Sequence, residues 1–206
     1  NVSFNAAIKQ CNFTYQSLNG YGESIYAERS SFIFIENNYF YSSKTSEGNG
    51  NVIYLSSGLP FTTIVNNRFI DCGCSTIGSV IESEAKEFIF NDNIIRFTNP
   101  NQGTRGILFP CQCKVMISVS TISGCNTIGE GDGLLYRGDI SNQPEFIQIE
   151  TNTFENNNAS NGCALLMKIK ELPNITACTI KNHISGELIF CIFIQEKQFD
   201  KISFKL

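Results

Sequence analysis

The sequence contains no tryptophan and a single histidine, and charged residues make up only 17% of its 206 residues, against roughly 25% in an average domain. Its net charge of −4 argues against nucleic-acid binding, which requires a basic surface. No apolar run approaches the roughly 18 residues that a membrane-spanning helix needs. The longest such segment, Glu187–Ile194, has the length of a strand, so we expect no direct membrane span.

Short, mainly apolar triplets recur along the chain at a nearly constant interval. Their middle residues are separated by 28, 28, 27, 27, 30 and 24 residues, and are Ile25, Ile53, Ile81, Leu108, Leu135, Leu165 and Ile189. A repeat of this length indicates an array of stacked structural units rather than an ordinary globular core.

A second pattern lies about halfway between the triplets and has the same period. Two or three alternating apolar residues precede a small polar residue, and a large apolar residue follows two positions later. The small polar column is Cys11, Asn38, Asn67, Asn93, Ser120, Asn152 and Cys178, and the apolar column is Phe13, Phe40, Phe69, Ile95, Ile122, Phe154 and Ile180. Stacked strands would place equivalent residues about 4.8 Å apart. The first column then predicts an asparagine ladder, and the second a continuous buried ridge.

These patterns predict an all-β fold, a right-handed parallel β-helix of seven to eight coils with 24–30 residues each. The L-x-x-L-x-L spacing of leucine-rich repeats is absent, and a propeller would need longer blades. We expect residues 1–206 to form one β-helix segment without an internal domain boundary. Both ends lie within the repeat and lack the polar cap of a solenoid, so we expect a fragment of a larger protein.

The nine cysteines do not form a disulfide pattern in this register. Cys72 and Cys125 share a column but lie two coils apart, about 9.6 Å, which exceeds the roughly 7 Å limit between bridged Cα atoms. We therefore expect mostly free, buried thiols. The C-x-C pairs Cys72–Cys74 and Cys111–Cys113 lack further ligands, and His183 is the sole histidine. The sequence accordingly predicts no metal site and no cofactor.

The acidic residues do not form a recognisable catalytic set. Polysaccharide lyases and hydrolases need two or three clustered carboxylates. Glu82 and Glu84 share one strand, but the residues aligned with Glu82 in the neighbouring coils are Tyr54 and Phe109. We predict no catalytic residues and a non-enzymatic protein. A carbohydrate-active enzyme whose catalytic coils lie elsewhere remains the alternative.

Four aromatic residues occupy one position of the triplets: Tyr26, Tyr54, Phe109 and Tyr136. The column is interrupted by Glu82, which favours an outward orientation and a binding face for a glycan or a protein partner. An inward orientation within the core is the other interpretation. The sequons at Asn12, Asn158 and Asn174 are candidate glycosylation sites.

Residues 153–165 resemble the repeat of polymorphic outer-membrane proteins, which pairs F-x-x-N with G-G-A-I on a right-handed β-helix. Phe154 and Asn157 match the first half, and Gly162, Ala164 and Leu165 match the second, with Cys163 in place of a glycine. The resemblance implies an extracellular or cell-surface role in adhesion or protein assembly, through the outer strand faces and neighbouring coils of the parent chain. An intracellular scaffold component is a further alternative.

Overall fold

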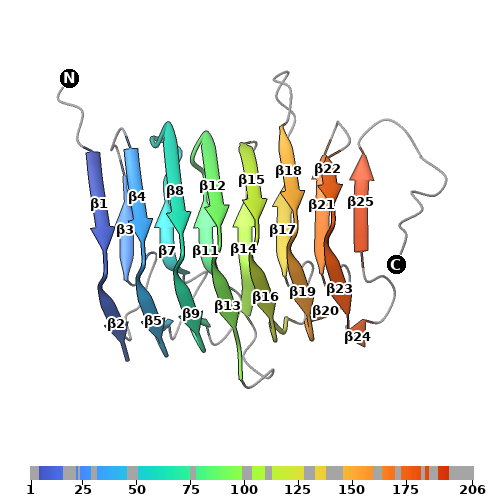
Figure 1. Ribbon diagram of the computed structural model, residues 1–206, viewed down its shortest axis with the longest axis horizontal. Coiled ribbons are helices and arrows are strands. Elements are labelled where there is room, and N and C mark those ends of the chain that lie inside the picture. The colour runs from blue at the N-terminus through green and yellow to red at the C-terminus, as the bar shows by residue number, and fades with distance from the viewer. Residues whose placement is uncertain are drawn as a thin grey trace.

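The chain folds as a parallel β-helix, in which three sheets wind together around one apolar core (Figure 1). The computed structural model describes residues 5–15, 22, 24–28, 32–45, 51–74, 78–98, 104–109, 113–127, 133–137, 146–159, 164–169, 173–181, 184–185 and 190–194. The predicted fold class is confirmed, and the described residues include no helix able to span a membrane.

Each of the three main sheets contains seven parallel strands. Sheet A, at the front of Figure 1, comprises β1 (Asn5–Lys9), β4 (Phe32–Glu36), β8 (Phe61–Val65), β12 (Glu87–Asn91), β15 (Lys114–Ser118), β18 (Ile147–Glu150) and β22 (Asn174–Thr176). Sheet B comprises β2 (Asn12–Thr14), β5 (Tyr39–Tyr41), β9 (Arg68–Ile70), β13 (Ile94–Arg96), β16 (Thr121–Ser123), β19 (Thr153–Glu155) and β23 (Thr179–Lys181).

Sheet C lies behind sheet A in Figure 1. It comprises β3 (Ile25–Ala27), β7 (Asn51–Leu55), β11 (Gly78–Ser83), β14 (Thr104–Phe109), β17 (Leu134–Arg137), β21 (Leu165–Ile169) and β25 (Phe190–Ile194). Two further pairs of short strands add to the coils, β6 (Lys44–Thr45) with β10 (Gly73–Cys74) and β20 (Asn158–Ala159) with β24 (Ile184–Ser185).

The number of turns is about five, slightly fewer than the predicted seven to eight coils. The first and last strands of sheets A and B are the ends of the stack. Inward residues there, such as Ile8, Phe13 and Ile180, are only half-buried, because a neighbouring strand covers them on one side alone. Between these strands the corresponding positions are enclosed.

The predicted apolar ridge is confirmed on the inner face of sheet B. Phe13, Phe40 and Phe69 are in register on successive strands, and their rings stack with centroids 4.6 and 4.5 Å apart. Ile95, Ile122 and Phe154 continue the ridge, all with at most 1% of their surface exposed. Strand alternation produces this result, because every second side chain of a strand points toward the same face.

Two columns of residues with a left-handed backbone conformation turn the chain between strands, and the first of them lies between sheets A and B. Gln10, Asn37, Asn66, Asp92, Val119, Thr151 and Ala177 separate sheet A from sheet B, with φ between 51° and 57°. Each of these residues from Gln10 to Thr151 donates its backbone N–H to the next coil. Asparagine and aspartate tolerate this conformation, whereas Val119 is a β-branched outlier. The stacked hydrogen bonds therefore impose the conformation even where the residue type opposes it.

Thr62 is an inward residue of β8 that carries a hydroxyl into the core. It lies in register between Ile33 and Phe88, is fully buried, and its Oγ1 has no hydrogen-bond partner among the described residues. A buried polar atom without a partner costs about 1–3 kcal/mol. The unpaired hydroxyl of Thr62 therefore destabilises β8 locally.

Replacing Thr62 with valine should raise the free energy of unfolding by about 1 kcal/mol, because valine keeps the shape and removes the unsatisfied hydroxyl. Urea unfolding measures the change. Thr153→Val, on the half-exposed outer face of β19, is the matched control and should shift stability by less than about 0.5 kcal/mol. A loss of stability in Thr62→Val would mean that the hydroxyl is satisfied in solution.

Candidate functional site

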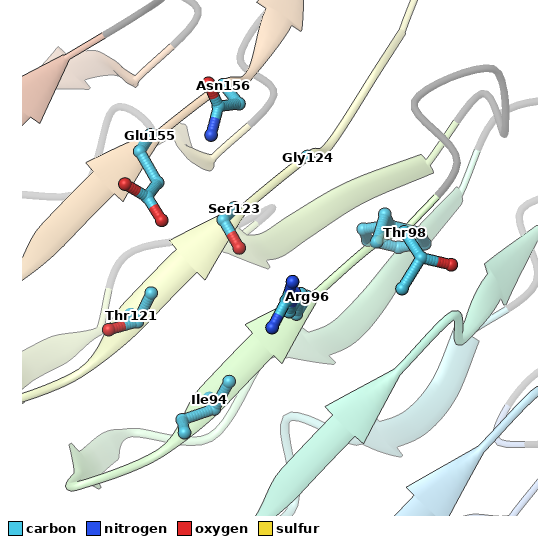
Figure 2. Close-up of a pocket in the computed structure, with 9 residues that line it drawn as sticks. Ile94, Arg96, Thr98, Thr121, Ser123, Gly124, Glu155 and Asn156 are labelled. Atoms are coloured by element: carbon cyan, nitrogen blue, oxygen red, sulfur yellow. The ribbon is translucent and has the colours of Figure 1, made fainter.

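A hollow of about 420 Å³ opens on the outer face of sheet B (Figure 2). It spans β13, β16 and β19, and its lining residues are Ile94, Arg96, Phe97, Thr98, Thr121, Ser123, Gly124, Glu155 and Asn156. This volume lies within the usual range for small-ligand sites, about 300–1,000 Å³. The hollow is therefore large enough for one or two sugar units or a ligand of similar size.

The hollow forms where the second column of turn residues is interrupted. Tyr15, Ser42, Asp71, Gly124 and Asn156 each adopt positive φ after a strand of sheet B. Phe97 occupies the same position, since its N–H bonds to the carbonyl of Ser123. Its φ is not positive, and its ring is buried in the core. The outer surface at this coil consequently lacks the side chain that the regular turn would present.

Gly124 deepens the hollow in the next coil. Its φ is +72°, and a Cβ atom at this position would lie 2.4 Å from the carbonyl oxygen of Phe97. Any larger residue would meet that backbone, so the position requires glycine. The irregular Phe97 and the glycine beside it leave the floor of the hollow open.

Arg96, Ser123 and Glu155 form one column across the hollow, on successive strands. Strand spacing places Arg96 and Glu155 about 9.6 Å apart at their Cα atoms, with the short Ser123 side chain between them. Figure 2 shows the two charged side chains on either side of Ser123. A cation and an anion therefore flank Ser123, which is only 6% exposed and whose hydroxyl donates to the Ile95 carbonyl at 3.5 Å.

The two charges differ in their partners. The Glu155 carboxylate pairs with Lys181 Nζ at 2.9 Å, on the neighbouring strand β23. Arg96 is exposed and forms no ion pair with any residue that the structure describes. A guanidinium group presents several N–H donors in a planar arrangement that suits carboxylates and phosphates. Arg96 is thus available to an acidic ligand group.

Hydroxyl and amide groups complete the polar lining. Thr98 is held by Asp71, since its N–H and its Oγ1 both donate to that carboxylate, at 2.7 and 2.9 Å to Oδ1. Thr121 and Asn156 add a further hydroxyl and an amide, and Ile94 contributes an apolar surface. Such a lining can hydrogen-bond a polyhydroxylated molecule. It contains a single carboxylate, so it lacks the pair that glycoside hydrolysis requires.

The described residues contain no group of three or more histidine, cysteine, aspartate or glutamate side chains able to hold a metal ion. In the part of the chain that the structure describes, Cys11, Cys72, Cys113, Cys125 and Cys178 form no disulfide. Cys72, Cys113 and Cys125 are buried, Cys11 is exposed, and burial raises the pKa of the half-buried Cys178 thiol. Cys111, Cys163 and the side chains of Cys74 and Cys191 lie outside the described residues, as does His183.

The predicted asparagine ladder is present at the turn between sheets A and B. Its members Asn38, Asn67, Asn93, Ser120 and Asn152 are buried, with at most 2% of their surface exposed. Asn38 N–H donates to Asn67 Oδ1 at 2.8 Å, and Asn67 N–H donates to Asn93 Oδ1 at the same distance. Ser120 Oγ accepts from Asn93 N–H at 3.1 Å, and Asn152 Oδ1 accepts from Ser120 N–H at 2.9 Å.

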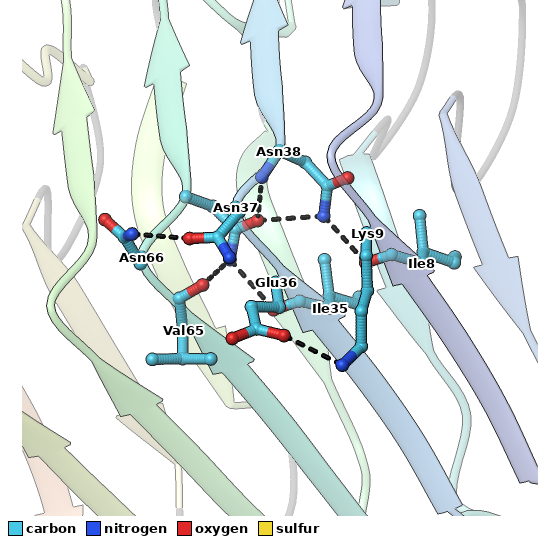
Figure 3. A network of polar contacts seen from close by, with 9 residues as sticks. Ile8, Lys9, Ile35, Glu36, Asn37, Asn38, Val65 and Asn66 are labelled. Atoms are coloured by element: carbon cyan, nitrogen blue, oxygen red, sulfur yellow. Dashed lines mark hydrogen bonds and ion pairs between the residues drawn. The ribbon is translucent and has the colours of Figure 1, made fainter.

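A parallel row of exposed amides borders this ladder (Figure 3). Asn66 Nδ2 donates to Asn37 Oδ1, and both residues belong to the left-handed column that precedes the ladder. Inside, Asn38 Nδ2 also donates to the Ile8 carbonyl at 2.9 Å. The buried ladder is therefore a structural element that satisfies backbone groups at the turn, and its side chains are inaccessible to a ligand.

The aromatic column of the triplets is divided between two environments. Tyr26 and Tyr54 lie on the outer face of sheet C with ring centroids 5.4 Å apart, and Tyr26 is 55% exposed. Phe109 and Tyr136 point inward and are fully buried. The strand in register with Glu82 presents Leu108, one residue earlier than the sequence alignment assumed. A one-residue shift moves a side chain to the opposite face, so the continuous four-residue face is not formed.

Beyond Glu82 the outer face of sheet C is covered. Leu135 and Leu166 are fully buried and pack with Leu108 in a small separate cluster. Tyr136 donates its hydroxyl to the Cys113 carbonyl at 3.1 Å, inside the coil. The two remaining tyrosines, the exposed Tyr26 and the half-buried Tyr54, form a short pair at one end of the sheet.

The acidic residues considered from the sequence occupy separate positions. Glu82 is buried at 8% exposure, and Glu84 accepts a hydrogen bond from the Tyr54 hydroxyl at 3.1 Å. Burial raises the pKa of Tyr54 first, and the hydrogen bond to Glu84 raises it further. Neither carboxylate reaches the hollow in sheet B.

The three candidate glycosylation sites differ in accessibility. Asn12 on β2 and Asn174 on β22 are exposed. Asn158 on β20 is half-buried, and its Nδ2 donates to Asn126 Oδ1 at 3.2 Å. A glycan must attach to this same amide nitrogen, so Asn12 and Asn174 are the more accessible acceptors.

Sequence reasoning missed Arg96, Ser123 and Glu155 as a group. Each is an ordinary polar residue at the end of a short strand, and the register of sheet B alone brings them together. The signal available beforehand was Phe97, a phenylalanine at a position where the other described coils carry Tyr15, Ser42, Asp71, Gly124 and Asn156. No protein-family model, curated protein or solved structure matches this chain.

Proposed function

We propose that this β-helix is a non-enzymatic binding module of a larger surface or structural protein, and that the hollow in sheet B binds a glycan. The observation that carries the proposal is the column Arg96–Ser123–Glu155 with hydroxyls on both sides. Sugars present hydroxyl groups that donate and accept hydrogen bonds, and Arg96 offers a site for an acidic substituent. The polymorphic outer-membrane protein resemblance of residues 153–165 supports a surface location.

The competing function is carbohydrate-active catalysis. A hydrolase needs a second carboxyl group near the first, about 5–9.5 Å away. Among the described lining residues Glu155 alone carries a carboxylate, and that group is paired with Lys181. This arrangement favours binding over bond cleavage.

Titration of the chain with neutral and uronic-acid oligosaccharides, followed by NMR or calorimetry, tests the proposal. Arg96→Ala should weaken binding of the acidic ligand at least tenfold, or about 1.4 kcal/mol, because a charged hydrogen bond is lost. Arg68→Ala is the matched control, since Arg68 is exposed on the same sheet but does not line the hollow. It should bind like the wild type.

Ser123→Leu provides an independent variant, because the larger side chain fills the hollow without changing the charges. It should abolish binding of neutral and acidic sugars alike. Failure of every oligosaccharide to bind, or unchanged binding by Arg96→Ala and Ser123→Leu, would overturn the glycan assignment. Release of new reducing ends during long incubation would favour the enzyme instead.

A further inference from the structure

Three tyrosines gather on the outer face of sheet B, at the end of the sheet that begins with β2. Tyr39 and Tyr41 are the two outward residues of β5, and Tyr15 follows β2 in the neighbouring coil. Tyr15 is 74% exposed and Tyr39 is 37% exposed, while Tyr41 is half-buried. These residues are called the tyrosine platform below. Exposed aromatic side chains that lie together mark a site of interaction.

The rings of the tyrosine platform are already packed against one another. Those of Tyr39 and Tyr41 are nearly parallel, with centroids 6.2 Å apart, and Tyr15 meets the Tyr41 ring edge-on at 5.4 Å. Rigid aromatic side chains give up little conformational entropy when a ligand packs on them. The platform is therefore ordered before anything binds to it.

A sequon lies directly beside the tyrosine platform. Asn12-Phe13-Thr14 makes up β2, in which Asn12 and Thr14 are exposed and Phe13 points inward. The parallel register pairs Asn12 with Tyr39 and Thr14 with Tyr41. Residues in register point to the same face of a sheet. The asparagine that accepts a glycan and the hydroxyl that the transferring enzyme reads therefore both face the tyrosine side.

A sugar on Asn12 would fall within contact of the Tyr39 ring. Neighbouring strands are about 4.8 Å apart, which is close to the length of one pyranose ring. A pyranose carries C–H groups on its apolar face, and their partial positive charge is attracted to the negative face of an aromatic ring. Tyrosine hydroxyls can in addition hydrogen-bond acetamido and hydroxyl groups. Because the glycan is tethered, even a weak contact of this kind is well populated.

We propose that Asn12 carries an N-linked glycan whose first N-acetylglucosamine units pack on the tyrosine platform. The glycan comes from a lipid-linked pyrophosphate donor. A bond forms between Asn12 Nδ2 and C1 of the sugar, the bond from C1 to the pyrophosphate oxygen breaks, and Nδ2 loses one proton. The proposal rests on the surface location proposed above, because this transfer takes place in the secretory pathway, but it does not depend on the ligand of the hollow.

The modified face and the hollow can be used at the same time. The tyrosine platform lies on β2 and β5, whereas the hollow begins at β13, two strands further along sheet B. This separation is about 9.6 Å between β5 and β13. The first sugars on Asn12 can therefore occupy the platform without covering Arg96.

Asn174 provides a matched control within the same chain. Its sequon, Asn174-Ile175-Thr176, also makes up a three-residue strand, β22, with the same alternation of exposed, half-buried and exposed residues. Its register neighbours on β18 are Gln148 and Glu150, which carry no aromatic ring. The two sites therefore differ chiefly in the tyrosines beside Asn12.

Two forms of the chain, each retaining one of these sequons, test the proposal. The other sequons are removed at their hydroxyl residues, by Ser3→Ala and Ser160→Ala in both forms and by Thr176→Ala or Thr14→Ala in one form each. A supplied signal sequence directs secretion from a eukaryotic host with oligomannose glycans. Endoglycosidase H then trims each glycan to one N-acetylglucosamine, and the same sequence made in bacteria is the unmodified reference.

Mass spectrometry of glycopeptides should find Asn12 occupied. The single sugar on Asn12 should raise the Tm by roughly 2–4 °C, the effect of one moderate contact in a chain of this size. The sugar on Asn174 should raise it by less than about 1 °C. Tyr39→Ser should keep Asn12 occupied and abolish the increase. In NMR spectra, C–H protons of the sugar on Asn12 should move upfield through the ring current of Tyr39, and this shift should disappear in Tyr39→Ser.

An unoccupied Asn12 in the secreted chain would overturn the proposal. So would equal Tm increases at Asn12 and Asn174, or an increase that survives Tyr39→Ser. Oligosaccharide titration of the hollow uses the chain made in bacteria, which carries no glycan. A hollow that binds no sugar would therefore leave the result at Asn12 unchanged, and the two proposals can fail separately.

Discussion

Asn67→Ala should lower the free energy of unfolding by about 3–5 kcal/mol, because both polar atoms of the buried asparagine side chain are fully used in hydrogen bonds. Its Oδ1 accepts from the N–H and the Nδ2 of Asn38, at 2.8 and 3.0 Å. Its Nδ2 donates to the carbonyls of Ile35 and Val65 and to Asn93 Oδ1. Alanine leaves several of these groups buried without partners, and each such group costs about 1–3 kcal/mol.

Two variants accompany this measurement by urea unfolding. Asn67→Ser should lose distinctly less stability, since Ser120 in the same column both accepts from Asn93 N–H and donates to the Ser118 carbonyl. Asn12→Ala, at an exposed asparagine of β2, should change stability by less than about 0.5 kcal/mol. Equal effects of the substitutions at positions 67 and 12 would contradict a stabilising role for the ladder.

Phe69→Ala should lower the free energy of unfolding by about 3–5 kcal/mol, because it leaves a cavity in the core. The Phe69 ring is fully buried and stacks on Phe40 at 4.5 Å. Its neighbour on the other side is Ile95, so neither coil can close the space without moving its strand. Equilibrium unfolding in urea measures the loss, with Phe69→Leu expected to lose less because it fills more of the cavity.

Phe146→Ala is the control for this substitution. Phe146 is 47% exposed, and its ring lies 5.4 Å from Lys114 Nζ at the margin of sheet A. Its removal should cost no more than about 1 kcal/mol, the usual range for an exposed cation–π contact. A small effect at Phe69 would mean that the ridge repacks, which dense cores rarely do.

The fold was predictable because local sequence and register agree over sheets A and B. An asparagine at a turn is followed two residues later by a large apolar residue. The asparagine hydrogen-bonds at the turn, and the apolar residue then points into the core. The ladder and the ridge therefore appeared in the sequence at the residues where the structure places them.

The triplets of sheet C were ambiguous for a physical reason. Ile107-Leu108-Phe109 and Leu134-Leu135-Tyr136 are entirely apolar, so no polar residue marks which side chain points outward. The hydrogen-bond register shifts the alignment by one residue relative to Glu82, which moves Phe109 and Tyr136 into the core. Alternation specifies a face only where polar and apolar residues differ.

The hollow and the outer face of sheet A depend on tertiary structure in the same way. The hollow follows from one turn residue, Phe97, whose ring packs inward. The outer face of sheet A carries apolar side chains from strands such as Phe32-Ile33-Phe34-Ile35, in which both faces are apolar. Such strands are typical of buried parallel sheets, so the sequence alone did not reveal that one face is uncovered.

The stacked register of this β-helix also determines the distances at which it can present groups. Equivalent positions on the surface are separated by whole multiples of about 4.8 Å along the axis. Lys9 and Lys114, on the first and fifth strands of sheet A, are therefore about four steps apart at their strands. Insertion or deletion of one complete coil would move every following surface by one step without altering the hydrogen bonds of the others, because each coil contacts only its neighbours. A multivalent partner would sense such a change as a shift in the spacing of its contacts, even if every contact kept its own chemistry.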